Sequence, residues 1–271
     1  MLLTGFFDYK DFIEGYHGQD YFSLTHIIFM ILATIAIVVL CIVFKNIKHE
    51  NLDKYLKVLS IYIPVMEIVK IVWETYFDIK MGHGFNWTGL LPLYTCSMFI
   101  YTLPFAAWAK GKLKDYALSW LGTIGIFGGL TNFYLTQILH TYPFWTYASF
   151  MSLSFHFLMV ITGLLIVVSK YKTFTFKDII TAWIPVLVFS IIVIPVDYIL
   201  KADYMLYYYG NGAPILPDLA NFFASHNLRF IYTIFMVIGY AIIAGLFISV
   251  YKLIGKIAQV IKTKNSKKVI N

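Results

Sequence analysis

Long apolar runs, separated by short polar segments, occupy most of the chain between residues 23 and 252. A helix needs about 20 mostly apolar residues to cross the hydrocarbon core of a bilayer. Seven runs reach roughly this length, and the second is the least regular because Glu67, Lys70 and Glu74 interrupt it. The pattern predicts an all-α polytopic membrane helix bundle with about seven transmembrane helices, at roughly 23–44, 58–78, 89–108, 116–137, 147–169, 178–199 and 229–252.

The segments between these runs show no internal repeat, so we expect residues 1–271 to form a single transmembrane domain. The longest of them, residues 200–228, is rich in aromatic residues and contains Gly and Pro. This composition is too apolar for a free linker. We therefore expect a lid-like segment that packs on the membrane face of the bundle or dips into it.

Lysines mark one side of the predicted bundle. Most of them lie in residues 45–57, 110–114 and 170–177 and in the tail after Lys252, which follow the first, third, fifth and seventh spans. Because cytoplasmic loops carry the excess of Lys and Arg, this pattern places the N-terminus outside and the C-terminus in the cytoplasm. The net charge of +7 then reflects topology, and we expect no nucleic-acid partner.

Composition agrees with a membrane protein: 60% of the residues are hydrophobic and 13% are charged, against roughly 25% charged in soluble domains. The first residues lack the basic start and short apolar core of a signal peptide. We expect a multi-pass integral protein of the cell membrane. Cys41 and Cys96 fall in opposite halves of the bilayer, so we expect no disulfide between them.

Polar residues inside the spans fall mostly in the predicted outer half of the membrane. Such residues are costly in lipid and therefore indicate function. Their shared depth predicts a polar cavity that opens toward the outer surface or the outer leaflet. The residues are His26, Glu74, Cys96, Thr131, Asn132, His156, Asp197 and Arg229.

Cys96 is a candidate nucleophile, since a thiolate can attack an ester if a base or a positive charge lies nearby. His156 matches Cys96 in depth, and His26 is a second candidate base; Asn132, Glu74 or Asp203 could orient the base. The competing interpretation is that Cys96 is a small packing residue, as we expect for Cys41, which has no polar neighbours in the sequence.

Glu67, Lys70 and Glu74 share one face of the second span, at spacing i, i+3, i+7. They could form an internal structural salt bridge, orient a catalytic histidine or bind a head group. A small-molecule or ion-coupled transporter would use them as a coupling network, and a charge network reaching the cytoplasmic side would favour that function; the sequence indicates none. A metal-dependent membrane hydrolase would instead need ligands such as His26, His156 and Glu74.

Several short motifs occur in a characteristic order: "FSLTHII" (22–28), "LLPLYTCSM" (90–98), "GGLTNFY" (128–134), "SFHFLMV" (154–160) and "ADYMLYY" (202–208). This series resembles the YwaF-type bacterial integral membrane proteins, which are similar to the eukaryotic transmembrane protein 164 acyltransferases. The resemblance covers residues 22–245 or so. In two places the chain departs from it: Asn132 stands where the family has an acid, and Asp203 stands where it has an amide.

The resemblance implies acyl transfer from a membrane phospholipid to a lysophospholipid through a cysteine thioester, without a metal or cofactor. Cys96 and His156 would be the catalytic pair. The residues expected to bind the substrate are Thr131, Asn132, His26, Glu74, Asp203 and Arg229, of which Arg229 suits a phosphate because of its planar fork.

Overall fold

The computed structural model describes residues 5–10, 22–136, 138–211 and 215–270, and most of these residues are helical, with no strand among them. The predicted all-α class is confirmed. The main helices are α1 (Leu24–Phe44), α2 (His49–Lys80), α3 (Trp87–Leu90), α4 (Met98–Trp108), α5 (Gly111–Trp120), α6 (Ile126–Tyr134), α7 (Ile138–Thr141), α8 (Tyr147–Val168), α9 (Asp178–Leu200), α10 (Leu216–Ser225) and α11 (Arg229–Ile270). Two short elements, the π-helix η2 (Leu121–Gly125) and the 3₁₀ helix η3 (Tyr204–Leu206), complete the set.

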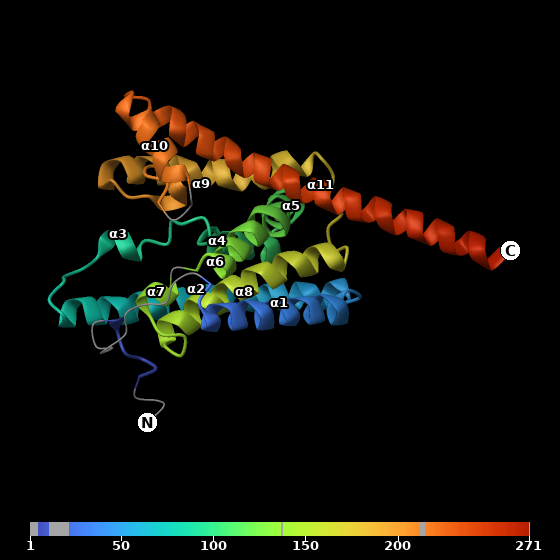
Figure 1. Cartoon of the computed structure of the whole chain (residues 1–271), viewed down its shortest axis with the longest axis horizontal. Helices are drawn as coiled ribbons and strands as arrows, with labels where there is room; N and C mark the ends of the chain where they lie inside the picture. The colour runs from blue at the N-terminus through green and yellow to red at the C-terminus, as the bar shows by residue number, and fades with distance from the viewer. Residues whose placement is uncertain (1–4, 11–21, 137, 212–214, 271) are drawn as a thin grey trace.

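The helices form three groups that lie side by side in Figure 1. α1, α2 and α8 run together on one side, and α9 and α11 run together on the other. α4, α5 and α6 lie between these groups, since α4 packs on α2, α6 packs on α8 and α5 packs on α9. The last part of α11 extends beyond the rest of the bundle.

Apolar side chains cover both the inside and the outside of the bundle. On α2, Leu56 and Ile63 are fully buried, whereas Val58, Ile68 and Val72 are each more than 60% exposed. So much exposed apolar surface indicates a lipid environment. Among the described helices, four are long and apolar enough to cross a membrane: α1, α8, α9 and residues Arg229–Thr263 of α11. The chain is therefore an integral membrane protein, while the count of seven crossings and their orientation remain predictions.

The predicted third span, 89–108, is not one continuous helix. α3 ends at Leu90, α4 begins at Met98, and the residues between them are not helical. Pro92 explains the break, because a proline disfavours the helical conformation of the preceding residue, and its own nitrogen cannot donate a hydrogen bond. Cys96 consequently lies in the turn that precedes α4, and not within a helix as the sequence predicted.

The predicted fourth span, 116–137, corresponds to α5, η2 and α6 in succession, which begin earlier, at Gly111, and end at Tyr134. A π-helical turn inside a longer helix is frequently found near a functional site. Glycines bring this helix close to α8: a Cβ at Gly129 would lie 2.4 Å from Val160 Cγ2, and one at Gly163 would lie 2.3 Å from the Leu121 carbonyl oxygen. The close approach sets the distance between α6 and the part of α8 that carries His156.

Within the predicted lid-like segment 200–228, residues 204–207 pack inside the bundle, whereas α10 buries only Ala220 among its residues. Tyr204, Met205 and Tyr207 are each at most 1% exposed. Two tyrosines of α11 hold this segment: the Tyr240 hydroxyl donates to the Met205 carbonyl at 3.1 Å, and the Tyr232 hydroxyl donates to the Leu206 carbonyl at 2.9 Å. Residues 204–207 therefore form part of the core.

Candidate functional site

Cys96 and His156, which are 60 residues apart in the sequence, line the same cavity of about 190 Å³. Four elements form its walls: α2, the non-helical segment before α4, α7 and α8. The polar residues that line it are Glu67, Lys70, Glu74, Tyr94, Cys96, Ser97, Ser152 and His156. The cavity thus combines a thiol, an imidazole and a charged cluster.

The hydrogen bonding of His156 indicates its tautomer. Its Nδ1 lies 2.6 Å from the carbonyl oxygen of Ser152, one turn earlier on α8. A carbonyl only accepts, so Nδ1 carries the proton and Nε2 is left with a free lone pair. The side chain is 6% exposed, and Nε2 has no hydrogen-bond partner among the described residues. His156 is therefore positioned to accept a proton at Nε2.

Cys96 lies at the N-terminal end of α4. Its carbonyl oxygen accepts a hydrogen bond from the Phe99 backbone N–H at 3.0 Å, which closes the turn that leads into the helix. The N-terminus of a helix carries a partial positive charge, and this charge favours a thiolate over a thiol. The broken span thereby gives Cys96 a helix N-terminus that a continuous helix could not provide.

Glu67 and Lys70 form an ion pair on the wall of this cavity. Lys70 Nζ lies 2.7 Å from Glu67 Oε1, and the side chains of Lys70 and Glu67 are 31% and 12% exposed. Glu74 lines the same cavity one turn further along α2. A polar cluster of this kind meets the requirement that intramembrane charges pair with one another and face the interior.

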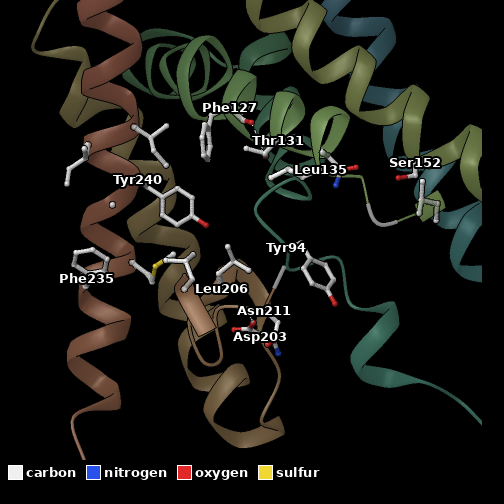
Figure 2. A pocket seen from close by; sticks show the side chains of 17 residues that line it. Tyr94, Phe127, Thr131, Leu135, Ser152, Asp203, Leu206, Asn211, Phe235 and Tyr240 are labelled. Carbon is white, nitrogen blue, oxygen red and sulfur yellow. Dashed lines mark hydrogen bonds between the residues drawn. The ribbon is translucent and has the colours of Figure 1, made fainter. Parts of the chain in front are cut away.

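A larger cavity of about 890 Å³ adjoins the first one, since both are lined by Tyr94, Ile138 and Ser152. Figure 2 shows how side chains from distant parts of the chain converge on it, including Thr131 from α6, Asp203 and Asn211 from the lid-like segment, and Tyr240 from α11. Its volume lies in the range of roughly 300–1,000 Å³ that is usual for small-molecule sites.

Three of the predicted substrate-binding residues, Thr131, Asn132 and Asp203, line this larger cavity. The Thr131 hydroxyl donates to carbonyls of the preceding turn. Asp203 accepts four backbone hydrogen bonds, at 2.6–3.1 Å, from the loop of residues 208–211. The Asp203 carboxylate thus organises a loop of the cavity wall, a role that the sequence did not indicate.

His26 and Arg229 line neither cavity. His26 is 1% exposed and both of its ring nitrogens are engaged: Nδ1 accepts from the Phe22 N–H at 3.1 Å, and Nε2 lies 2.9 Å from the Phe133 carbonyl oxygen. It joins the start of α1 to the end of α6. Arg229 donates to the Tyr208 carbonyl at 2.6 Å, and its guanidinium lies 4.1 Å from the centre of the Tyr208 ring. It braces the lid-like segment.

Two further residues contribute to the cavities without having been predicted. Ser152 supplies the carbonyl that fixes the His156 ring, and its position four residues earlier on a helix could have revealed it. Tyr240 lines the larger cavity, and its hydroxyl lies 2.5 Å from Thr95 Oγ1, next to Cys96. Nothing in the sequence links residue 240 to residue 95.

A second polar cluster lies at the other end of the bundle, where the sequence indicated no charge network. Lys114 Nζ lies 2.9 Å from Asp53 Oδ1, the Tyr171 hydroxyl donates to the same Asp53 oxygen, and Lys172 pairs with both Asp115 and Asp178. Burial tends to raise the pKa of the Asp53 carboxyl, but the bonds from Tyr171 and Lys114 outweigh it and bring this pKa below its ordinary value.

This second cluster is distant from the first. Asp53 and Glu67 are 14 residues apart on the same helix, or about 21 Å at 1.5 Å per residue. The cluster joins the beginning of α5 and the loop that precedes α9 to the start of α2. It therefore ties three elements together and does not extend the Glu67–Lys70 pair into a continuous path.

In a comparison with protein families, the model described as the TMEM164 family matches residues 21–247. No curated protein and no solved structure matches the chain. The matched region includes Cys96, His156 and all of the residues that line the two cavities.

Proposed function

Because this chain belongs to the TMEM164 family, as the match over residues 21–247 shows, we propose that it is a membrane-embedded lipid acyltransferase. The proposed reaction moves a fatty acyl chain from a membrane phospholipid to a lysophospholipid through a thioester on Cys96. The observation that carries the proposal is the shared cavity, where Cys96 lies with a histidine whose Nε2 has no hydrogen-bond partner among the described residues.

In the first half-reaction, His156 Nε2 takes the proton from the Cys96 thiol, and the thiolate attacks the ester carbonyl of the phospholipid. The carbonyl oxygen becomes an oxyanion. When this intermediate collapses, the bond between the acyl carbon and the ester oxygen breaks, and the leaving oxygen takes the proton from His156. The products are an acyl thioester on Cys96 and a lysophospholipid.

In the second half-reaction, the hydroxyl of the acceptor lysophospholipid gives its proton to His156 Nε2 and attacks the thioester carbonyl. The carbon–sulfur bond breaks, the new ester is released, and the Cys96 thiolate takes the proton back from His156. The cycle needs no net change in charge or oxidation state. The Ser152 carbonyl would keep the imidazole oriented through both halves, since it holds Nδ1–H.

The polar groups around the thiol suit the charges that this reaction would create. Lys70 places an ammonium on the wall of the cavity, and a thiolate or an oxyanion is stabilised by such a charge in a site of low dielectric constant. Tyr94 lines both cavities, so its hydroxyl is a candidate donor to the oxyanion. Asn132 lines only the larger cavity, where it suits the polar part of the lipid.

The direct test is intact-protein mass spectrometry of the purified protein after incubation with a phospholipid. We expect an added fatty-acyl mass that hydroxylamine removes, as it does for thioesters. The adduct should be absent in Cys96→Ala and present in Cys41→Ala, the matched control, because Cys41 lies on α1 and lines neither cavity. Acyl transfer to a labelled lysophospholipid should likewise be lost in Cys96→Ala and retained in Cys41→Ala.

His156→Ala provides a second readout. Removing a general base typically slows a reaction by about 10²–10⁴-fold, so this variant should form the adduct slowly and transfer it slowly. Full transfer activity in Cys96→Ala would rule out the thioester on Cys96. Absence of both adduct and transfer in the wild-type protein would favour the transporter or the metal-dependent hydrolase. Flux of a solute into liposomes that survives Cys96→Ala would support the former, and loss of hydrolysis on chelation would support the latter.

A further inference from the structure

The larger cavity has one apolar wall that the proposed chemistry does not use. This wall is a single face of α11, formed by Phe235, Met236, Gly239, Ile242 and Ile243. From residue 235 to residue 243 it extends about 12 Å along the helix axis. The opposite wall carries Phe127 and Leu135 from the region of α6.

The cavity is open beside α11. Phe235 and Ile242 line it and are nevertheless 49% and 57% exposed. α11 is one of the helices that are long and apolar enough to cross the membrane, so an opening along its side lies at the depth of the lipid tails. An amphiphile could therefore enter sideways from the bilayer without passing through water.

Gly239 lies in the middle of this wall. A Cβ added at Gly239 would have no atom within 4 Å. The bare backbone thus leaves room that any larger residue would fill. Because glycine inside a helix is less stable than residues with a side chain, its presence here costs helix stability, and the space that it leaves is the only compensation visible in the described structure.

We propose that the face of α11 around Gly239 binds the acyl chain of the phospholipid, and that Gly239 determines which chains fit. The substrate, a phospholipid, rests on the proposed function. The polar residues of the same cavity, Asn132 and Asn211, lie where they can contact the polar part of the lipid. The shared residues Tyr94, Ile138 and Ser152 mark the passage from this cavity to Cys96, so the ester bond would reach the thiol while the chain stays against α11.

The experiment uses the full-length Cys96→Ala protein, which can bind lipid but cannot form the thioester. The probe is a phosphatidylcholine that carries a photoreactive group on its acyl chain, and the crosslinked peptides are identified by mass spectrometry. We expect crosslinks on residues 235–243 of α11 and on α6. Adding Gly239→Leu should reduce crosslinking of the long-chain probe about tenfold, the effect of losing the burial of roughly two methylene groups, and should leave a short-chain probe nearly unaffected.

The matched control is Gly255→Leu, which changes the same residue type on the same helix and also has no atom within 4 Å of its added Cβ, but lies outside the cavity lining. Crosslinks elsewhere on the protein, or equal labelling of Gly239→Leu and the control by the long-chain probe, would overturn the inference. Because no covalent chemistry is required, binding at α11 can succeed even if the wild-type protein forms no acyl adduct, and the two proposals fail separately.

Discussion

At the scale of single residues, His156 is oriented by a main-chain carbonyl and not by another side chain. In many nucleophile–base pairs a third side chain orients the base, and the sequence predicted Asn132, Glu74 or Asp203 in that role. Here the Ser152 carbonyl engages Nδ1, so the geometry of the base depends on the helical conformation of α8. A side-chain substitution at Ser152 leaves this carbonyl in place.

The ion pair beside Cys96 leads to the first prediction at this scale. Removing either partner of a buried pair leaves an uncompensated charge, which costs about 3–5 kcal/mol when burial is complete. Because Lys70 is 31% exposed, we expect a smaller loss of about 1–3 kcal/mol for Glu67→Gln or for Lys70→Met. The double variant should recover part of this loss, and thermal unfolding in detergent measures it.

The same variants separate a structural role from a functional one. If the pair only stabilises the fold, the double variant should regain both stability and acyl transfer. If Lys70 stabilises the thiolate, the double variant should regain stability while transfer stays low. The exposed pair Lys54–Glu50, whose side chains are 68% and 75% exposed, is the control, and its removal should change neither property by a measurable amount.

Sequence reasoning identified some of these residues for reasons that can be stated. Cys96 and His156 were chosen because polar groups at a common depth converge in a bundle, and the structure places both on one cavity. His26 and Arg229 were chosen on the same argument, and Asp203 as a possible orienter of the base, yet the partners of all three are backbone groups. Residue type and depth do not reveal which backbone groups a fold will leave in need of a partner.

At the scale of elements, the predicted spans differ from the helices mainly where the backbone is irregular. The apolar run 89–108 has the composition of a single helix, but Pro92 divides it. The proline was visible in the sequence, although a proline inside an apolar run can also be accommodated, as Pro104 is in α4 and Pro185 is in α9. Whether a proline breaks or merely bends a helix depends on the packing around it, which no local pattern records.

The cluster that joins the start of α2 to the beginning of α5 and the loop before α9 predicts a pH dependence. The pKa of Asp53 in the folded protein lies below its ordinary value, so its carboxylate stabilises the fold above the unfolded pKa of about 3.9. This contribution is lost as the pH falls through the folded pKa. We expect Asp53→Asn to be less stable than wild type at neutral pH and to lose less stability on acidification from about pH 5 to pH 3.

Unfolding in detergent across this pH range is the measurement, with Glu50→Gln as the matched control, because Glu50 lies on the same turn of α2 but its side chain is 75% exposed. Parallel pH profiles for wild type and Asp53→Asn would show that the bonds from Lys114 and Tyr171 do not stabilise the protein. Transfer activity at neutral pH should be unchanged, since Asp53 lines neither cavity.

At the scale of the whole molecule, the orientation of the bundle in the membrane follows from its lysines alone. We predict that a membrane-impermeant maleimide added to intact cells labels a cysteine introduced at Asn221, on α10. A cysteine at Lys112, at the start of α5, should react only after the membrane is permeabilised. Both sites are exposed, and the background protein is Cys41→Ala, Cys96→Ala, so that only the introduced thiol reports.

The opposite labelling pattern would show that the bundle has the inverse orientation in the membrane. The two cavities would then face the inner leaflet, and the donor lipid would have to come from there. The proposed chemistry at Cys96 would be unaffected, because it depends on the contacts inside the bundle.

Hydrophobic patterning was sufficient to predict the class of the molecule, since long apolar runs in a chain with few charges have little alternative to a helix bundle in lipid. It could not decide whether residues 204–207 lie on the membrane face of the bundle or enter it. The aromatic composition of this segment fits either location. Its position depends on hydrogen-bond partners on three other elements: Ser190 on α9, Thr88 on α3 and Tyr240 on α11.

The broken span determines how a lipid and the thiol can meet. The segment from Leu91 to Ser97 is not helical, and one of its carbonyls, that of Pro92, is paired by the Tyr101 hydroxyl and not by a backbone N–H. A peptide group of this segment that lost its partner would cost several kcal/mol if hydrocarbon surrounded it. The Cys96 thiol therefore cannot move out into the bilayer to reach its substrate. The lipid must instead leave its neighbours in the leaflet and enter the cavity. Membrane fluidity and the ease of extracting one lipid from its leaflet would then govern how fast the protein is supplied.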